Sequence, residues 1–287
     1  MNKLLLILIF AALTFASPAT AYLAYVSNEK GNTISIIDTD KLDVVATIKV
    51  GRRPRGVELN KDGSELYICA GDDDAIQVLD AKAQKIIGKL PSGPDPELLT
   101  LSPDGETIYV SNENDNLVTL IDIKRKDQIG DIPVGVEPEG MAISPDGKLL
   151  AYLQGGKAWK LNLAEENATA QPLFYSRGSI SSLAFNSSGK QILFVSNREE
   201  HSFIGVYDFV NNQVNFIDAS TYNDSDPVWN KEGTHIAFVR TVNIKYQIGF
   251  TPRPTAAQPW EIRIAEVATN KASTLFKAEE GMGSLFV

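Results

Sequence analysis

The chain has 287 residues, of which 43% are hydrophobic and 22% are charged, so it can fill an ordinary core and is not a disordered protein. The formal net charge of −9 argues against nucleic acid and anionic lipid as partners, because both call for a basic surface. The same charge favours solubility, cations or a basic partner.

The N-terminal segment has the layout of a secretory signal. Lys3 precedes an apolar run over 4–16, and the segment ends in the small-residue sequence Ala19-Thr20-Ala21. A run of this length is too short to cross a bilayer of roughly 30 Å as a helix. We therefore predict a signal peptide over 1–21 and a periplasmic or secreted protein with no membrane attachment after cleavage. An uncleaved anchor or a buried core helix is the alternative.

Cys69 is the only cysteine, so no disulfide can form within one chain. It lies in the apolar stretch "ELYICA", where we expect a buried hydrophobe rather than a nucleophile or a metal ligand. An exported protein without disulfides suits a bacterial periplasm.

One kind of turn recurs along the chain. Five equivalent dipeptides follow one another at spacings of 42, 42, 42 and 44 residues: Asp62-Gly63, Asp104-Gly105, Asp146-Gly147, Ser188-Gly189 and Glu232-Gly233. An Asp-Gly pair supplies the positive φ angles that a tight hairpin needs. Turns in one register across most of the chain leave little room for a second domain, so we expect a single domain over 22–287.

Each period contains short runs of β-branched and aromatic residues. In one period these are "ETIYVSN", "LVTLIDI", "QIGDIPV" and "GMAIS". Four short antiparallel strands every 42 residues are typical of a propeller blade and close to the WD40 spacing. The sequence therefore predicts an all-β fold, a β-propeller.

The number of blades follows from counting strands. The "YVSN"-type strand is expected to start at six positions: Tyr22, Glu65, Thr107, Leu149, Gln191 and His235. The innermost type of strand appears five times, and the C-terminal segment 283–287, "GSLFV", is the candidate for a sixth. If this segment completes the sheet begun at Tyr22, the ring closes and no strand edge is left exposed. We expect about six four-stranded blades closed in this way; the alternative is a truncated piece of a seven- or eight-bladed propeller.

Residues 22–147 carry the recurring elements "YVSN", "IDT" and "VGRRPRG". This part resembles the YVTN family of β-propellers, in particular the periplasmic type that accompanies PQQ-dependent alcohol catabolism. The resemblance implies a propeller over about three blades and an association with that periplasmic oxidation. It implies nothing about a ligand.

Residues 148–287 have a different sequence pattern. A D-x-x-P-x-W-like marker precedes one of the repeated turns and consists of Asp224, Asp226, Pro227 and Trp229. This part is similar to the propeller of S9-family, dipeptidyl-peptidase-IV-like serine peptidases and to the PD40 repeats of TolB-like proteins. That family implies a C-terminal α/β-hydrolase domain with a Ser-Asp-His triad. No G-x-S-x-G elbow occurs in this sequence, so we expect no peptidase activity, only the propeller's gating or docking surface.

The loops of antiparallel strands alternate between two faces of the ring. The Asp-Gly hairpins lie on one face, and the other face, here called the mouth face, receives the loops after "YVSN" and the loops before the innermost strands. Loops at a ring mouth converge on the central channel, which is the default ligand or partner site. The predicted binding residues on this face are Arg52, Arg53, Arg55, Asp72, Asp73, Asp74, Glu97, Glu113, Glu137 and Glu139.

Two chemistries are open at these residues. The acids offer oxygen ligands for a hard cation, but "GDDDA" lacks the spacing of a calcium loop, so we predict neither a metal nor a cofactor. The three arginines of "GRRPRG" have the geometry to clamp a carboxylate or phosphate. The favoured alternative is that they pair with the neighbouring acids Asp95 and Glu97.

Other polar residues are expected to be structural. His201 and His235 stand alone and do not suggest a zinc site or a general-base pair. Four aspartates recur at equivalent strand ends and are expected to cap turns in their own blades: Asp38, Asp80, Asp122 and Asp208. The insertion over 243–262 is either an aromatic partner-binding patch or a loop packed on its own blade.

The sequence thus predicts an exported, monomeric, non-catalytic β-propeller that binds a protein partner or a small ligand at its mouth face. One alternative is the substrate-gating propeller of an S9-type peptidase without its catalytic domain. A further alternative is a lactonase-like propeller enzyme with a central metal.

Overall fold

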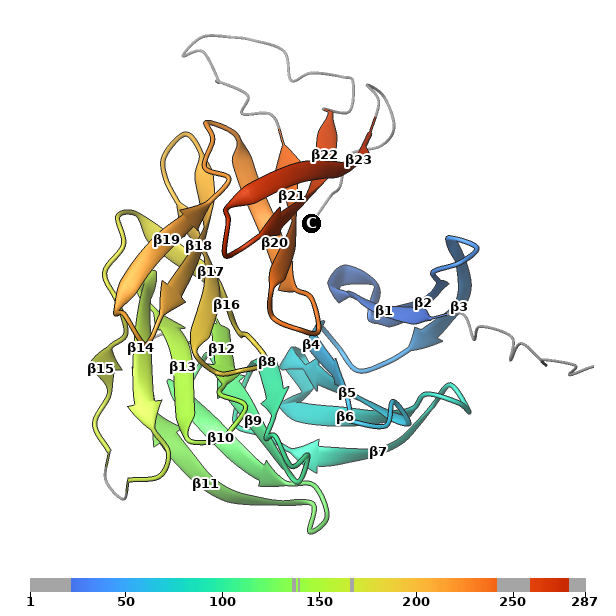
Figure 1. Cartoon of the computed structure of the whole chain (residues 1–287). Coiled ribbons are helices and arrows are strands. Elements are labelled where there is room, and N and C mark those ends of the chain that lie inside the picture. Colours follow the sequence, from blue (N-terminus) through green and yellow to red (C-terminus); the bar gives the residue numbers. More distant parts are fainter. Residues whose placement is uncertain (1–21, 136–137, 139, 166–167, 242–258, 279–287) are drawn as a thin grey trace, which may run out of the picture.

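A computed structural model describes residues 22–135, 138, 140–165, 168–241 and 259–278. The predicted signal peptide, the predicted closing strand over 283–287, and most of the insertion over 243–262 lie outside these residues. The described residues form six antiparallel sheets arranged around a common centre, as a β-propeller (Figure 1). The predicted all-β fold and six blades are confirmed.

The first three blades come from the N-terminal half. The first holds β1 (Leu23–Asn28), β2 (Thr33–Asp38) and β3 (Asp43–Lys49). The second holds β4 (Pro54–Leu59), β5 (Glu65–Ala70), β6 (Ala75–Asp80) and β7 (Lys85–Pro91). The third holds β8 (Pro96–Leu101), β9 (Thr107–Asn112), β10 (Leu117–Asp122) and β11 (Asp127–Pro133). Two short 3-10 turns, η1 (Glu29–Gly31) and η2 (Gly71–Asp73), follow β1 and β5.

The remaining blades have four strands each. The fourth holds β12 (Gly140–Ile143), β13 (Leu149–Gln154), β14 (Lys157–Asn162) and β15 (Gln171–Pro172). The fifth holds β16 (Ser179–Phe185), β17 (Gln191–Asn197), β18 (Ser202–Asp208) and β19 (Gln213–Ile217). The sixth holds β20 (Asn223–Trp229), β21 (His235–Thr241), β22 (Trp260–Glu266) and β23 (Lys271–Lys277).

The innermost strands hold the ring together. Contacts run from β4 to β8, from β8 to β12, from β12 to β16 and from β16 to β20. The first blade joins through β1 and β4, and among the described residues it has three strands, with β1 paired only to β2. The inner position beside β1 is therefore where the closing strand was predicted, and that prediction stays open.

The repeated turns are built as their sequences predict. Gly63, Gly105 and Gly147 have φ angles of +72°, +78° and +72°, which only glycine adopts without strain. The preceding Asp62 accepts a hydrogen bond through Oδ1 from the Ser64 amide at 2.9 Å, which fixes the turn locally. The same bond recurs at Asp104 and Asp146 one and two periods later.

The four strand-end aspartates do cap turns. Asp80 Oδ1 accepts from the amides of Lys82 at 2.9 Å and Ala83 at 2.7 Å. Equivalent bonds to amides two or three residues ahead form at the other three positions: Asp38, Asp122 and Asp208. Their structural role is confirmed.

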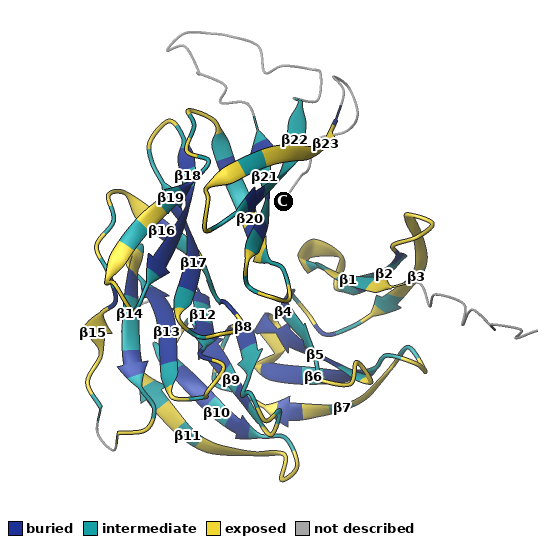
Figure 2. Ribbon diagram, viewed as in Figure 1, coloured by how far each residue is buried: buried dark blue, intermediate teal, exposed yellow. Residues whose placement is uncertain are grey.

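The core lies between neighbouring blades. Middle strands such as β5 are buried almost continuously, because a blade covers each of their faces, whereas outer strands such as β7 are largely exposed (Figure 2). Tyr67 and Cys69 of β5 pack in one cluster with Leu99 and Val110 of the next blade. Cys69 is fully buried, as predicted, and burial raises the pKa of its thiol. In the part of the chain that the structure describes, no helix has the length and apolarity to span a membrane.

Candidate functional site

Strand direction sorts the loops onto the two faces as predicted. The hairpins that join β4 to β5 and β6 to β7 lie on one face, and their equivalents in the other blades lie there too. The mouth face carries the turns of the β5–β6 type and the connections between blades, such as β3–β4 and β7–β8. Charged side chains that reach from one blade to another gather on this mouth face.

The arginine–carboxylate cluster comprises Arg53, Arg55, Asp95, Glu97 and Glu113. Arg53 and Asp95 precede the inner strands β4 and β8, Arg55 and Glu97 lie at the starts of those strands, and Glu113 follows β9. The 42-residue period places Arg55 and Glu97 at the same point of adjacent blades. Their side chains therefore meet across the boundary between the second and third blades.

Glu97 is the centre of the cluster. Its Oε1 accepts hydrogen bonds from Arg53 Nη2 at 2.9 Å and from Arg55 Nη1 at 2.6 Å, and its side chain is only 10% exposed. Arg53 also pairs with Asp95, and its Nε lies 3.5 Å from Asp72 Oδ1. The prediction that the three arginines pair with Asp95 and Glu97 is confirmed for Arg53 and Arg55. It is wrong for Arg52, which pairs with Asp73 of the adjacent turn.

The backbone that presents Arg53 and Asp95 is unusual. Both residues have positive φ angles, +52° and +56°, which cost energy for non-glycine residues. Each amide donates to a side-chain oxygen of the preceding blade: Arg53 N to Asn32 Oδ1 and Asp95 N to Asp74 Oδ1, both at 2.9 Å. The preceding blade thus holds each mouth-face connection in place.

The carboxyl groups of Glu97 and Glu113 lie close together in this cluster, with an oxygen of each within 4.8 Å of the other. Burial raises the pKa of Glu97 to about 7, and a hydrogen bond with Glu113 adds to the shift while Arg55 and Arg53 oppose it. Glu97 therefore keeps its proton to a higher pH than an exposed glutamate does.

The neighbouring predicted residues join the same network. Asp73 accepts from Arg52 Nε at 2.6 Å and from the Arg52 amide at 2.8 Å, and Arg52 also donates to the Asp72 carbonyl. Every predicted binding residue that the structure describes is therefore connected to the others through polar contacts. Glu137 and Glu139 lie outside the described residues.

The acids of the cluster have one feature of a cation site. Asp95, Glu97 and Glu113 each offer an oxygen within 4.8 Å of the others. Arg53 and Arg55 already donate to Glu97, so positive charge is supplied there by guanidinium groups. The donor set suits arginine recognition at least as well as it suits a hard cation.

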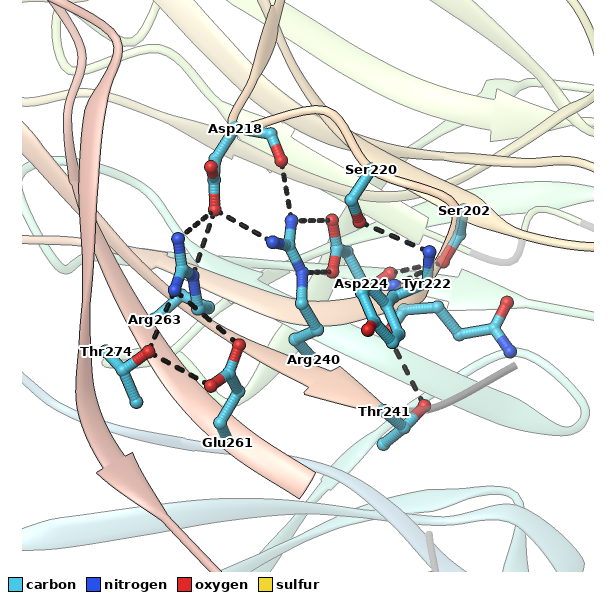
Figure 3. A network of polar contacts seen from close by, with 11 residues as sticks. Ser202, Asp218, Ser220, Tyr222, Asp224, Arg240, Thr241, Glu261, Arg263 and Thr274 are labelled. Carbon is cyan, nitrogen blue, oxygen red and sulfur yellow. Dashed lines mark hydrogen bonds and ion pairs between the residues drawn. The ribbon is translucent and has the colours of Figure 1, made fainter. Parts of the chain in front are cut away.

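A second polar network lies on the mouth face of the sixth blade (Figure 3). Arg240 of β21 donates to Asp224 of β20 from Nε at 2.7 Å and from Nη2 at 2.8 Å, a two-pronged pair. Arg240 Nη1 also donates to Asp218 Oδ2 at 2.9 Å, and Arg263 of β22 donates to the same oxygen at 2.6 Å. The network ties the connection before β20 to three strands of the blade.

These charges are deeply buried. Asp224 is 0% exposed and Arg240 is 7% exposed. Burial raises the pKa of Asp224, and the hydrogen bonds from Arg240 oppose that shift. For Arg240, burial lowers the pKa, but the carboxylates of Asp224 and Asp218 raise it by more, so the pKa of Arg240 is raised overall.

Sequence reasoning missed this network, although Asp224 stood in the marker pattern. The sequence signal that could have revealed it is Arg240, a charged residue inside the strand "HIAFVRT", where alternate positions are buried. A buried arginine requires a carboxylate partner, so its position predicts one nearby. The marker residue Trp229 donates from Nε1 to the carbonyl of Ala184 in the fifth blade at 2.9 Å.

The two histidines are far apart in the fold. His201 lies in the β17–β18 turn on the mouth face, with its ring 4.7 Å from that of Phe203. His235 begins β21 at the hairpin face and bonds to Thr234 Oγ1. They form no pair.

Comparisons with known proteins identify the fold. Neither a protein-family model nor a curated protein sequence matches the chain. Among solved structures, hydrazine synthase of Kuenenia stuttgartiensis superposes with a TM-score of 0.63 at 16% identity, over 88% of this chain and 92% of that one.

A second similar structure is the dihydro-heme d1 dehydrogenase NirN in complex with DHE, with a TM-score of 0.57 at 14% identity over 89% of this chain. This chain spans only 53% of the length of NirN. At these identities the likeness extends to the fold alone, so the YVTN and S9 resemblances stay predictions. The chain is a six-bladed β-propeller.

Proposed function

We propose that the protein is an exported, non-catalytic propeller whose mouth face binds a protein partner or a small polar ligand. A propeller presents loops of every blade at one mouth and is in general suited to a scaffold role, although the fold does not name the ligand. One contrast between the two faces carries the proposal, and it concerns how their charged residues are used.

On the hairpin face, the repeated aspartates bond to amides of their own turns, as Asp62 and Asp80 do. On the mouth face, charged side chains contact other blades, as Arg53 does with Asp95 and Glu97. Ion pairs in partly buried positions contribute little net stability, because desolvation offsets the attraction. Their concentration on one face, with a perturbed glutamate among them, supports a binding role for that face.

The finer proposal is an association with periplasmic PQQ-dependent oxidation. It is supported by the signal-like segment over 1–21 and by the YVTN-like sequence elements of 22–147. A propeller portion of an S9-type peptidase is the alternative, supported by the marker residues Asp224 and Trp229, which contact Arg240 and Ala184.

A capture experiment from an extract of the source organism tests the proposal. The mouth variant combines Arg52→Ala with Asp72→Ala, whose side chains are 64% and 53% exposed, so the fold should be unaffected. The matched control combines Lys82→Ala with Arg125→Ala, exposed residues of two hairpin-face turns. We expect the mouth variant to lose most of a partner that wild type and control retain. Identical partner sets for all three proteins, or loss only in the control, would contradict the proposal.

A further inference from the structure

A cavity of about 760 Å³ opens on the mouth face of the fifth blade, away from the arginine–carboxylate cluster. It lies between the connection that precedes β16 and the turn that joins β17 to β18. Its lining includes Arg177, Arg198, Glu199, Glu200, His201 and Phe203. Two arginines thus face a space large enough for a small ligand.

These two arginines differ from the others on the mouth face. The following arginines of that face each form an ion pair with a carboxylate: Arg52, Arg53, Arg55, Arg240 and Arg263. Within the ranges that the structure describes, neither Arg177 nor Arg198 forms an ion pair. Glu199 and Glu200 line the same cavity, but neither forms an ion pair with these arginines, so both guanidinium groups keep donors for an anion.

Arg198 is held in a fixed orientation with unused donor capacity. Its guanidinium carbon lies 5.6 Å from the ring centre of Phe203 and 5.9 Å from that of Phe216, so two aromatic rings position the group. Its Nε is buried and has no hydrogen-bond partner. No side-chain hydrogen bond of Arg198 forms among the described residues, so the guanidinium group has donors available for an acceptor in the cavity.

The segment that carries Arg177 lies against Arg198. Ser196 Oγ donates to the Arg177 carbonyl at 2.9 Å, which fixes the connection beside the end of β17. A Cβ placed on Gly178 would be 3.2 Å from Arg198 Cδ. The two arginines are therefore carried by backbone segments that lie against each other and are joined by a hydrogen bond.

We propose that this cavity binds a small ligand through an oxyanion group, a carboxylate or a phosphate, with Arg198 as the two-pronged donor and Arg177 as the second cation. The inference rests on the proposed function insofar as both place binding on the mouth face. The net charge of −9 and the exposed Glu199 and Glu200 repel extended polyanions, so recognition depends on short-range hydrogen bonds to a small anion.

Calorimetric titration of the purified full chain with succinate and, separately, with inorganic phosphate tests the proposal at constant ionic strength set with sodium chloride. We expect saturable binding of at least one anion, and the preferred one separates a carboxylate source from a phosphate source. Arg198→Gln should weaken that binding at least tenfold, because it removes a charge-assisted two-pronged contact. Arg198→Lys keeps the positive charge but lacks the two-pronged geometry, so its affinity for the anion should lie between those of wild type and Arg198→Gln.

Two further variants keep the test decisive. Arg177→Gln changes an exposed side chain, so it should weaken binding several-fold without affecting the thermal unfolding midpoint, even if Arg198→Gln misfolds. Arg125→Gln changes an exposed arginine on the hairpin face and should bind as wild type. Absence of binding by both anions, or unchanged affinity in Arg177→Gln and in a folded Arg198→Gln, would overturn the inference. Partner capture that still depends on Arg52 and Asp72 would then leave the proposed function standing.

Discussion

At the scale of single residues, Glu97 shows what the mouth face requires of a charged group. Two arginines donate to it, yet burial and the hydrogen bond with Glu113 raise its pKa to about 7. The exposed aspartates of the hairpin face are in the opposite situation, because hydrogen bonds from Ser64 lower the pKa of Asp62. The surroundings of Glu97 thus favour its protonated form, whereas those of Asp62 favour its charged form.

The raised pKa of Glu97 predicts a pH-dependent stability difference. The pKa of Glu97 is near 7 in the folded state and has an ordinary value of 4.5. Its contribution to the free energy of unfolding is therefore fully present below pH 4.5 and is lost as the pH rises through 7. Glu97→Gln removes this dependence, so from pH 4.5 to pH 8 the variant should gain stability relative to wild type, on the order of 2 kcal/mol. Urea denaturation at both pH values measures the difference. Glu200→Gln, at an exposed position, serves as the control, and a pH-independent difference for Glu97→Gln would refute the account.

The buried Arg240 predicts a large effect on stability. Arg240→Met leaves Asp224 as an uncompensated buried charge, which costs about 3–5 kcal/mol in unfolding free energy. Combining Arg240→Met with Asp224→Leu should recover part of that loss, because no charge is then stranded. Chemical denaturation compares both with Arg125→Met, for which a change within about 0.5 kcal/mol is expected. A loss in Arg240→Met no larger than in Arg125→Met would contradict the structural role of the network.

At the scale of elements, the blade is set by its turns. The left-handed residues recur with the period, for example Asn32, Asp74 and Asn116 at the turns on the mouth face, with φ angles of +53°, +48° and +61°. Asparagine, aspartate and glycine adopt this conformation at the lowest cost, which is why the turn pattern is visible in the sequence.

Two glycines of the second blade separate the effect of backbone angle from that of space. A Cβ at Gly63 or at Gly88 would meet no atom within 4 Å, but only Gly63 has a positive φ, +72°. Gly63→Ala should therefore cost about 1 kcal/mol of unfolding free energy, whereas Gly88→Ala should be neutral or slightly stabilising. Equal effects of the two substitutions on the denaturation midpoint would show that turn geometry does not govern blade stability.

Strand positions were largely predictable from the sequence. Five of the six predicted starts, including Glu65 and Thr107, are the first residues of β5, β9, β13, β17 and β21, and β1 begins one residue after Tyr22. The Asp-Gly turns and the two-sided burial of the middle strands dictate these boundaries locally. The pairing of Arg53 with Asp95 and Glu97 was also foreseeable, because the period places their loops side by side.

Other contacts were not predictable, for physical reasons. The network of Arg240, Asp218 and Arg263 depends on strand pairing within the sixth blade across an insertion that interrupts the period. Whether Arg177 and Arg198 form ion pairs depends on which carboxylates lie within reach of them. Glu199 and Glu200 follow Arg198 in the sequence and would be expected to pair with it, but in the structure they do not.

At the scale of the whole molecule, the two faces of the ring differ in how their charged groups are used, and we propose that the mouth face is the binding face. The hairpin face is fixed by local hydrogen bonds, and the mouth face joins blades through charged groups and holds the cavity beside Arg198. The proposal predicts that substitutions of exposed mouth-face residues change recognition while the core between blades stays intact.

Site-specific photo-cross-linking tests this division most directly. The native Cys69 is fully buried, so an added exposed cysteine can be labelled selectively with a benzophenone maleimide. Glu200→Cys places the label on the mouth face and Lys82→Cys places it on the hairpin face, both at exposed positions. In extract of the source organism, we predict cross-linked products from Glu200→Cys and none above background from Lys82→Cys. Products from Lys82→Cys alone, or the same products from both positions, would contradict a binding role confined to the mouth face.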